Sequence, residues 1–380
     1  MHKHKQSQCK RKVKHRKNVM GLIIFCITVC IVFMFAYYQN LRKEISVRQE
    51  WLETVLTREK KWILENQGPE GEIYMNGSKA GDVNPYFACM AALGLLAETK
   101  NCPMTETEQK AVGRYLDWHT GVLLETDGKM GIYRKEGGEL IYKEKADSED
   151  GYLGMYLFLM GKYLEKTEST DLPESWKNGI SLALKKIQSL MQDGITQVSE
   201  ENTTVYLMDN LEVWKGLYEL ELAGLEDTQA ISEIRKKIQK QIEKIFWDDA
   251  NQRWRIIGNS DRYHQTEFYP DGVAQIYPLI YEFPVKEKKK QKVLYDQFTE
   301  RFQWQKLNKK RTGFLWAMTG MAAAQMRDIN NLVELVGNYE TEYCKKRKYP
   351  LYTGEAGWIC MECEKLYSLY ERKIKTGFLV

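Results

Sequence analysis

Histidine and the common catalytic motifs are scarce in this sequence. Only five of the 380 residues are histidines, and three of these lie within the first 15 residues. The remaining two, His119 and His264, are too few to predict a metal site. The GxSxG nucleophile elbow, the P-loop, the GxGxxG turn and the HExxH motif are all absent. The sequence therefore supports neither a serine hydrolase, nor a nucleotide-binding enzyme, nor a zinc peptidase, and we expect no cofactor.

Cysteine is sparse for a fold built on disulfides. Eight cysteines in a chain of this length do not form a disulfide scaffold. Cys360 and Cys363 form a single CxxC motif without a second pair or a nearby histidine, so it does not predict a zinc or redox site. The sequence does not decide whether a disulfide joins Cys344 to Cys360 or to Cys363. No linker rich in proline and serine divides residues 50–373, which we expect to form one domain.

Acidic residues are missing from the N-terminal tail. Residues 1–20 carry eight lysines and arginines and no acid. Because the whole chain has a net charge of +4 and this tail +8, the rest of the chain has a net charge of −4. A mildly acidic body argues against nucleic acid as a partner.

An uncharged apolar run at residues 21–38 follows the basic tail. It is just long enough to cross a bilayer as a helix, and it ends with the aromatic pair Tyr37 and Tyr38. The excess of positive charge before it predicts a cytoplasmic tail 1–20 and an extracytoplasmic body. No small-x-small cleavage site follows the run, so we expect an uncleaved signal-anchor, a single-pass position in the cell membrane and a stalk at residues 39–49.

Two kinds of apolar-periodic segment alternate after residue 50. One kind has a charged face, as amphipathic helices do; the other is apolar nearly all round and rich in glycine and alanine, which predicts buried helices. The amphipathic segments are 50–65, 105–118, 174–191, 227–246, 286–303 and 328–344. The apolar segments are 86–99, 150–165, 209–223, 271–283, 314–327 and 355–371.

The loops between these segments predict a closed ring. Each amphipathic segment forms a pair with the apolar segment that follows it. The loops within these pairs are mostly long and polar, and the loops between one pair and the next are mostly short. Six helical hairpins, with apolar helices inside and amphipathic helices outside, satisfy both patterns. We therefore predict an all-α fold, an (α/α)6 barrel at residues 50–373, preceded by one transmembrane helix and followed by a short tail at residues 374–380.

Acidic residues recur where the long loops enter the apolar helices, and aromatic residues accompany them. The ring would gather these entrances around one cavity. Carboxylates among flat aromatic faces suit sugars, which offer hydroxyl groups and apolar C–H faces. We expect Trp214, Phe314 and Tyr156 to belong to the core instead. The acidic candidates are Asp82, Asp147, Glu149, Asp150, Asp209, Glu212, Asp271 and Glu355, and the aromatic candidates are Tyr86, Tyr152, Tyr269 and Trp358.

These entrances resemble those of the six-hairpin glycosidases, and glycoside hydrolase family 8 most of all. In that family a Glu ahead of a Gly-Tyr-Gly-Met-type helix is the proton donor, and Asp82 occupies the matching position. An Asp-x-Asp-like signature resembles the stretch from Asp147 to Asp150, and the resemblance implies that Asp150 binds the distorted sugar. The catalytic base of the family resembles Asp271, in the run Tyr269 to Gln275.

Two positions depart from the family pattern. The donor position holds the shorter Asp82, which leaves Glu355 and Glu149 open as proton donors. The arginine expected after the base is replaced by Ala274 and Gln275. The family mostly inverts the anomeric centre, which implies two carboxyl groups about 6.5–9.5 Å apart.

The hypothesis that follows is a membrane-anchored, extracytoplasmic glycoside hydrolase that cleaves a β-linked polysaccharide by carboxylate acid/base catalysis. Asp82 would be the acid, Asp271 the base and Asp150 a sugar ligand. An inactive barrel that binds glycan within exopolysaccharide synthesis machinery is the alternative, favoured by the missing donor Glu. A polysaccharide lyase is disfavoured, because its site would need a cation for the uronate.

Overall fold

The structure is a computed structural model that describes residues 2–77, 81–137, 139–169, 171–225, 228–258, 260–264, 266–307 and 313–376. The chain divides into two compact units. Residues 52–369 form one unit, which holds the barrel. Residues 1–51 and 370–380 form the other.

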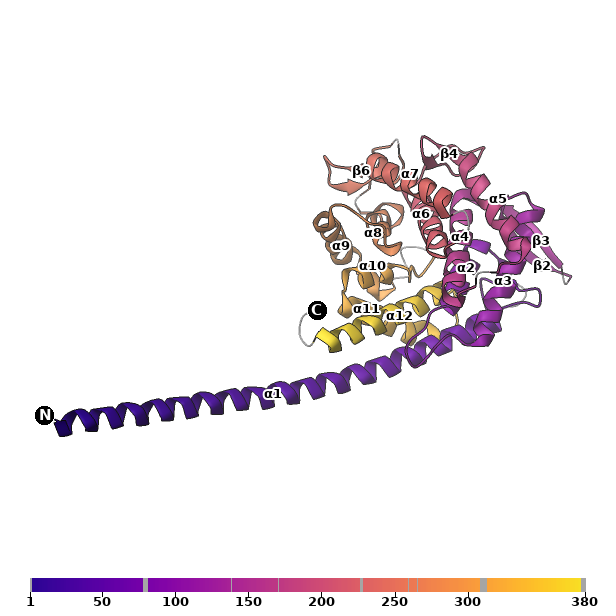
Figure 1. Ribbon diagram of the computed structural model, residues 1–380. Coiled ribbons are helices and arrows are strands. Elements are labelled where there is room, and N and C mark those ends of the chain that lie inside the picture. The colour runs from indigo at the N-terminus through magenta and orange to yellow at the C-terminus, as the bar shows by residue number, and fades with distance from the viewer. Residues whose placement is uncertain are drawn as a thin grey trace. The chain divides into compact units, whose positions relative to one another are not determined.

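The barrel contains two sets of helices, as the alternating segments predict (Figure 1). The inner helices are α2 (Pro85–Leu95), α4 (Glu149–Thr167), α6 (Leu207–Leu222), α8 (Val273–Ile280), α10 (Thr319–Met326) and α12 (Thr353–Thr376). The outer helices are the last part of α1 (His2–Glu65), α3 (Glu106–Glu125), α5 (Glu174–Leu190), α7 (Thr228–Phe246), α9 (Lys288–Phe302) and α11 (Ile329–Tyr339). The predicted all-α (α/α)6 barrel is confirmed.

The inner helices contact one another in chain order, and α12 closes the ring against α2. Glycines permit these close contacts. A Cβ atom on Gly94 would lie 2.4 Å from the Cα atom of Gly357, and a Cβ atom on Gly216 would lie 2.3 Å from the carbonyl oxygen of Gly154. Both distances are far shorter than a carbon atom can tolerate. Because the ring runs α2, α4, α6, α8, α10, α12, helices α6 and α12 face each other across it.

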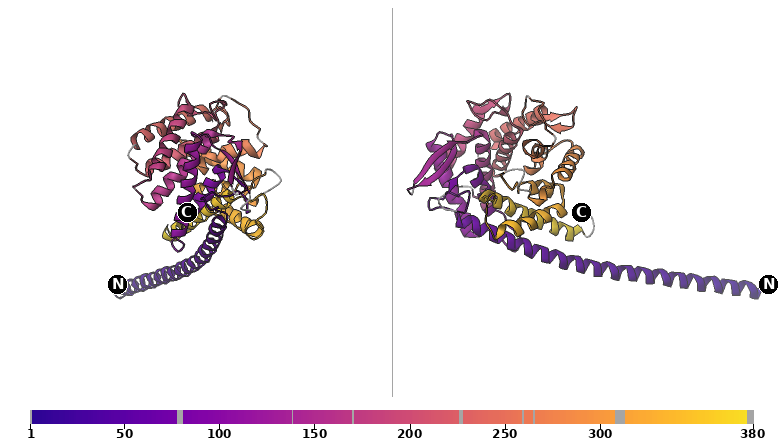
Figure 2. Two further views of the ribbon diagram at one scale, coloured as in Figure 1. Left: turned by 90° about the vertical axis from the view of Figure 1, so that its right-hand side faces the viewer. Right: turned by 180° about the vertical axis from the view of Figure 1, so that it is seen from behind.

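Short strands and turns occupy the long loops. The largest sheet is antiparallel in the order β1 (Asp82–Val83), β2 (Gly131–Glu136), β3 (Glu139–Lys145), and the β2–β3 hairpin projects at the edge of the barrel (Figure 2). Two small hairpins pair β4 (Met191–Gln192) with β5 (Ile195–Thr196) and β6 (Trp247–Asp248) with β7 (Arg253–Trp254). Single helical turns are η1 (Phe268–Gly272), η2 (Trp304–Lys306) and η3 (Glu340–Cys344).

Helix α1 is continuous from His2 to Glu65 and contains the apolar run. Within the described part of the chain, it is the helix that is long and apolar enough to cross a membrane. Its position near the N-terminus fits both a membrane anchor and a signal sequence.

Candidate functional site

A cavity of about 470 Å³ lies where several inner helices begin. Its polar lining comes mainly from the entrance to α4, from α6 and from α12. Its aromatic lining comes from α2, α4, η1, α8, α12 and the loop before α10. Among the described residues, no lysine, arginine or histidine lines it. The lining residues are Asn84, Tyr86, Phe87, Met90, Asp147, Ser148, Tyr152, Met208, Asp209, Glu212, Tyr269, Tyr277, Gly313, Phe314, Trp316, Met318, Glu355 and Trp358.

Glu212 is the most buried acid of the cavity, with 2% of its surface exposed. Its Oε1 atom accepts hydrogen bonds from the hydroxyls of Tyr86 at 2.5 Å, Tyr277 at 2.7 Å and Tyr281 at 3.3 Å. Burial raises the pKa of Glu212 to about 8, although these three hydrogen bonds oppose the rise because they stabilise the carboxylate. Glu212 is therefore an acid that holds its proton at neutral pH.

A second acidic group surrounds Ser148, the N-cap of α4. The Ser148 hydroxyl accepts from the backbone N–H of Gly151 and donates to Oδ1 of Asp150 at 2.8 Å. The buried Asp150 also accepts from the hydroxyl of Thr196 at 2.7 Å. Burial raises the pKa of Asp150, and burial together with the Asp150 and Glu212 carboxylates raises the pKa of the neighbouring Asp209 well above its usual range.

Glu355, at the start of α12, fixes the loop that precedes α10. Its carboxylate accepts from three successive backbone N–H groups, those of Leu315 at 3.0 Å, Trp316 at 3.1 Å and Ala317 at 2.8 Å. These bonds hold Trp316 at φ 58°, a left-handed conformation that an aromatic residue seldom adopts. Burial nevertheless raises the pKa of Glu355 to about 7. The carboxylate thus sets the position of the Trp316 ring in the cavity wall.

Aromatic rings form most of the remaining wall. Tyr86 lies 5.6 Å from Tyr152, Phe87 stacks on Phe314 at 5.4 Å, and Tyr269 lies 4.8 Å from Trp316, all between ring centroids. The indole Nε1–H of Trp358 is buried and has no hydrogen-bond partner among the described residues. A buried N–H group without a partner is unfavourable, so a ligand oxygen would stabilise it.

The predicted core position of Phe314 is wrong. The Phe314 ring is only half-buried and lines the cavity. Trp214 and Tyr156 are fully buried, as predicted.

The structure brings together eight of the predicted site residues. They share one feature, a side chain in the wall of this cavity. They are Tyr86, Asp147, Tyr152, Asp209, Glu212, Tyr269, Glu355 and Trp358.

Asp82, the expected acid, does not line the cavity. It lies on β1, opposite Arg134 of β2, and its carboxylate pairs with Arg134 Nε at 2.7 Å and with Lys143 Nζ at 2.7 Å. These cations lower the pKa of Asp82, the opposite of what a proton donor needs. Asp82 pairs with these side chains of the neighbouring strands and does not line the cavity, so the geometry gives no support to its assignment as the acid.

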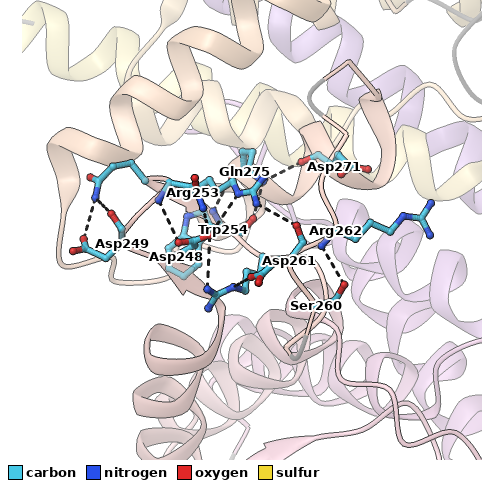
Figure 3. A network of polar contacts seen from close by, with 12 residues as sticks. Asp248, Asp249, Arg253, Trp254, Ser260, Asp261, Arg262, Asp271 and Gln275 are labelled. Atoms are coloured by element: carbon cyan, nitrogen blue, oxygen red, sulfur yellow. Dashed lines mark hydrogen bonds and ion pairs between the residues drawn. The ribbon is translucent and has the colours of Figure 1, made fainter.

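Asp271, the expected base, is also absent from the residues that line the cavity. It is buried, and its Oδ1 atom accepts from the backbone N–H of His264 at 2.5 Å. Gln275 stands where the family resemblance predicts an arginine. It binds both backbone polar groups of Trp254 in β7 and donates to the carbonyl oxygen of Asp271 at 3.1 Å (Figure 3). Gln275 fastens β7 to α8, and Asp271 fastens the segment after β7 to η1.

Asp150 and Glu149 lie just behind the cavity wall. Asp150 binds Ser148 and Thr196 as described above, so it supports the wall without lining it. Glu149 is buried and lies 3.3 Å from Nζ of Lys145. Neither carboxyl group lines the cavity, and we do not carry Glu149 forward as a proton donor.

Asn84, Ser148 and Tyr281 were missed as site residues. Asn84 caps α2 by accepting from the backbone N–H of Tyr86 and also lines the cavity. Tyr281 follows Tyr277 by four residues, a spacing that places two side chains on one helix face. That spacing was the available signal for Tyr281.

Metal and thiol chemistry receive no support from side-chain positions. No group of three or more histidine, cysteine, aspartate or glutamate residues could hold a metal ion within the described ranges. Cys344, Cys360 and Cys363 are buried and unbridged. Burial raises the pKa of each of these thiols, which disfavours the reactive thiolate.

No protein-family model and no curated protein sequence matches this chain. Solved structures do share its fold. A wild-type glycosidase matches with a TM-score of 0.58 and 12% identity over 87% of this chain and 98% of that chain. A β-1,3-1,4-glucanase from Paenibacillus sp. X4 matches with a TM-score of 0.53 and 11% identity over 84% and 93%. A sugar epimerase from a ruminal bacterium matches with a TM-score of 0.51 and 10% identity over 88% and 100%. The predicted likeness to six-hairpin glycosidases is confirmed at the level of the fold.

Proposed function

We propose that this protein is a glycoside hydrolase that cleaves a polysaccharide in the cavity described above. The observation that carries the proposal is Glu212, an acid with a pKa of about 8 in a wall of aromatic rings and further carboxyl groups. Hydrolysis of a glycosidic bond needs one protonated carboxyl group and one carboxylate beside the bond.

Glu212 is the proposed general acid. A raised pKa keeps it protonated at neutral pH, so it can give its proton to the leaving glycosidic oxygen. Because the three tyrosine hydroxyls donate to Oε1, this oxygen acts as the acceptor, and the acidic proton resides on Oε2.

Asp147 is the proposed base that activates water. It lines the cavity, is exposed to solvent, and lies ahead of α4, whereas Glu212 belongs to the next inner helix, α6. Two carboxyl groups from different hairpins can approach a sugar from different sides, which two neighbours on one helical turn cannot do. Glu355 is less suitable, because both of its oxygens accept backbone hydrogen bonds.

A β-linked polysaccharide is the proposed substrate, cleaved with inversion. The family resemblance of the helix entrances supports this, and so does the fold shared with a β-1,3-1,4-glucanase. We also propose that residues 21–38 anchor the protein in the cell membrane, with residues 1–20 in the cytoplasm and the barrel at 50–373 outside, on a stalk at 39–49. The basic tail and the apolar run support this orientation. There the enzyme would act near exopolysaccharide synthesis machinery.

A glycan-binding barrel without hydrolysis is the second candidate. It is favoured by Asp82, which stands where the family resemblance puts the proton donor and is paired with Arg134 and Lys143. In this case the cavity would bind sugar, and Glu212 would only hydrogen-bond to it.

Release of reducing ends distinguishes the two candidates. The detergent-solubilised full chain would be incubated with β-glucan, xylan, chitosan and bacterial exopolysaccharides, beside the variants Glu212→Gln and Asp147→Asn. We expect wild-type cleavage and a loss of about 10²–10⁴-fold in each variant. Asp82→Asn and Asp271→Asn serve as controls outside the cavity wall, and circular dichroism verifies their folding. Binding of a glycan without any cleavage would replace the hydrolase by the second candidate.

The acid and base roles separate further by rescue. In an inverting reaction azide can attack the anomeric carbon in place of the water that a lost base would activate, which gives a glycosyl azide. It cannot supply the proton that a lost acid would give to the leaving oxygen. If azide restores activity to Asp147→Asn and leaves Glu212→Gln inactive, the two roles are as proposed. The reverse pattern would exchange them.

A further inference from the structure

Aromatic side chains continue beyond the cavity along one side of its mouth. Tyr349 and Tyr352 do not line the cavity. They lie in the loop between η3 and α12, where Tyr352 is beside the wall residues Phe87 and Phe314. The sequence pattern places Tyr352 among the aromatic residues at the helix entrances and assigns no role to Tyr349.

The rings form a connected path from the cavity to the surface. Tyr352 lies 5.9 Å from Phe87 and 5.6 Å from Phe314, and Tyr349 lies 6.2 Å from Tyr352, between ring centroids. A Cβ atom on the wall residue Gly313 would lie 3.1 Å from the Tyr349 hydroxyl oxygen. Tyr349 therefore stands directly beside the cavity wall.

Exposure increases along this path. Phe87, Phe314 and Tyr352 are half-buried, whereas Tyr349 has 70% of its surface exposed. On the other side of Trp316, Tyr269 is also open, with 49% exposed. A core aromatic residue has little of its surface exposed. Packing in the core therefore does not account for the position of the Tyr349 ring.

We propose that Tyr352 and Tyr349 form an outlying binding site for further sugar units of the chain whose cleaved bond lies in the cavity. This inference rests on the proposed glycan site and deepens it, because it makes an extended polysaccharide the substrate. The occupant follows from continuity: a chain that leaves the cavity past Phe314 meets the Tyr352 and Tyr349 rings next. Pyranose rings place their apolar C–H faces on such aromatic surfaces, while their hydroxyl groups stay in water.

Binding of short and long oligosaccharides tests the site. Calorimetric titration would use the detergent-solubilised full chain carrying Glu212→Gln, so that a cleavable ligand stays intact. The ligands would be cellohexaose, xylohexaose and the glucosamine hexamer, each beside its dimer. We expect at least one hexamer to bind about tenfold more tightly than its dimer. In Tyr349→Ala this preference falls about fivefold to tenfold, while the affinity for the dimer is unchanged. In Tyr349→Phe the preference persists, because the ring is retained.

Tyr142→Ala is the matched control. Tyr142 is a similarly exposed tyrosine, 54% exposed, on β3 and outside the aromatic path. Its loss should leave the preference for hexamers intact. A hexamer preference that survives Tyr349→Ala, equal affinities of hexamer and dimer, or no binding of any hexamer would each overturn the proposed site.

The test of the outlying binding site and the test of hydrolysis can fail separately. Weaker hexamer binding in Tyr349→Ala without any reducing-end release would keep the outlying site and reject the hydrolase. Cleavage without a chain-length effect would keep the hydrolase and reject the outlying site.

Discussion

The hydroxyl of Tyr277 donates a 2.7 Å hydrogen bond to Oε1 of Glu212 in the interior of the barrel. Tyr86 donates to the same oxygen from α2, and so does Tyr281, which directly follows α8. Three donors on one buried carboxyl oxygen lower the pKa of Glu212, while burial raises it, and burial prevails. The balance of these opposing effects sets the pH range of the proposed acid.

Tyr277→Phe should move the alkaline limit of activity to higher pH. The variant removes a hydrogen bond that stabilises the Glu212 carboxylate, so the pKa of Glu212 rises above about 8. One hydrogen bond to a charged group corresponds to about one pH unit. The pH profile of kcat/KM measures the change. Tyr339→Phe, which removes a tyrosine hydrogen bond to the distant Glu59, should leave the profile unchanged.

Stability of the barrel should fall as the pH rises from about 5 to 8.5. Burial raises the pKa of Glu212 to about 8 and that of Glu355 to about 7, above the 4.5 of an unfolded glutamate. Between the unfolded and the folded pKa of each glutamate, the folded state binds more protons than the unfolded state. Each glutamate therefore lowers the free energy of unfolding by about 1.4 kcal/mol for every unit that the pH rises. Thermal unfolding followed by circular dichroism measures the trend.

Glu282 provides the contrast to this pH effect. Lys215 and Lys365 lower its pKa to about 2, so its contribution is lost only in acid, below about pH 4.5. The double variant Glu212→Gln, Glu355→Gln should flatten the slope between pH 5 and 8.5. An equal slope in the double variant would contradict the assignment.

Glu355→Gln should loosen the loop before α10. The amide NH₂ group cannot accept from a backbone N–H, so at least one of the Leu315, Trp316 and Ala317 donors loses its partner. We expect a loss of about 1–3 kcal/mol in the free energy of unfolding, measured in urea. Glu334→Gln, at an exposed position of α11, should change it by less than about 0.5 kcal/mol.

Uronate polymers should not bind. Asp147, Asp209, Glu212 and Glu355 line the cavity, and the described lining offers no basic side chain to pair with a substrate carboxylate. Calorimetry with polygalacturonate and alginate oligosaccharides should show no binding at concentrations where the neutral or amino-sugar hexamers bind. Tight binding of a uronate would contradict the electrostatic argument.

Gly357→Ala should destabilise the ring closure between α12 and α2. The new Cβ atom would lie 2.0 Å from the carbonyl oxygen of Met90, which is backbone and cannot rotate away. Overpacking of this kind costs about 1–3 kcal/mol. Gly121→Ala in α3 is the control, because apart from the chain neighbours and backbone of its own helix no atom lies within 4 Å of its Cβ position. There the higher helix propensity of alanine should raise stability by about 0.5–1 kcal/mol in the same urea titration.

The sequence alone determined the elements whose signals are local. Hydrophobic periodicity separates inner from outer helices, because a buried helix must be apolar all round and a covering helix needs one stripe. The N-cap Ser148 and the acids of the first turn of α4 are equally local. The gathering of Glu212, Asp209 and Glu355 at one cavity followed from ring closure of these helices.

Only the tertiary structure decided which acid faces the cavity. Asp82 and Glu212 both precede or begin an apolar helix, yet the pairing of β1 with β2 directs Asp82 to Arg134. Glu212 faces Tyr86 and Tyr277, which are 126 and 65 residues away in the chain. Its raised pKa depends on burial by these distant segments. Side-chain direction and desolvation are properties of packing, so short motifs could not have supplied them.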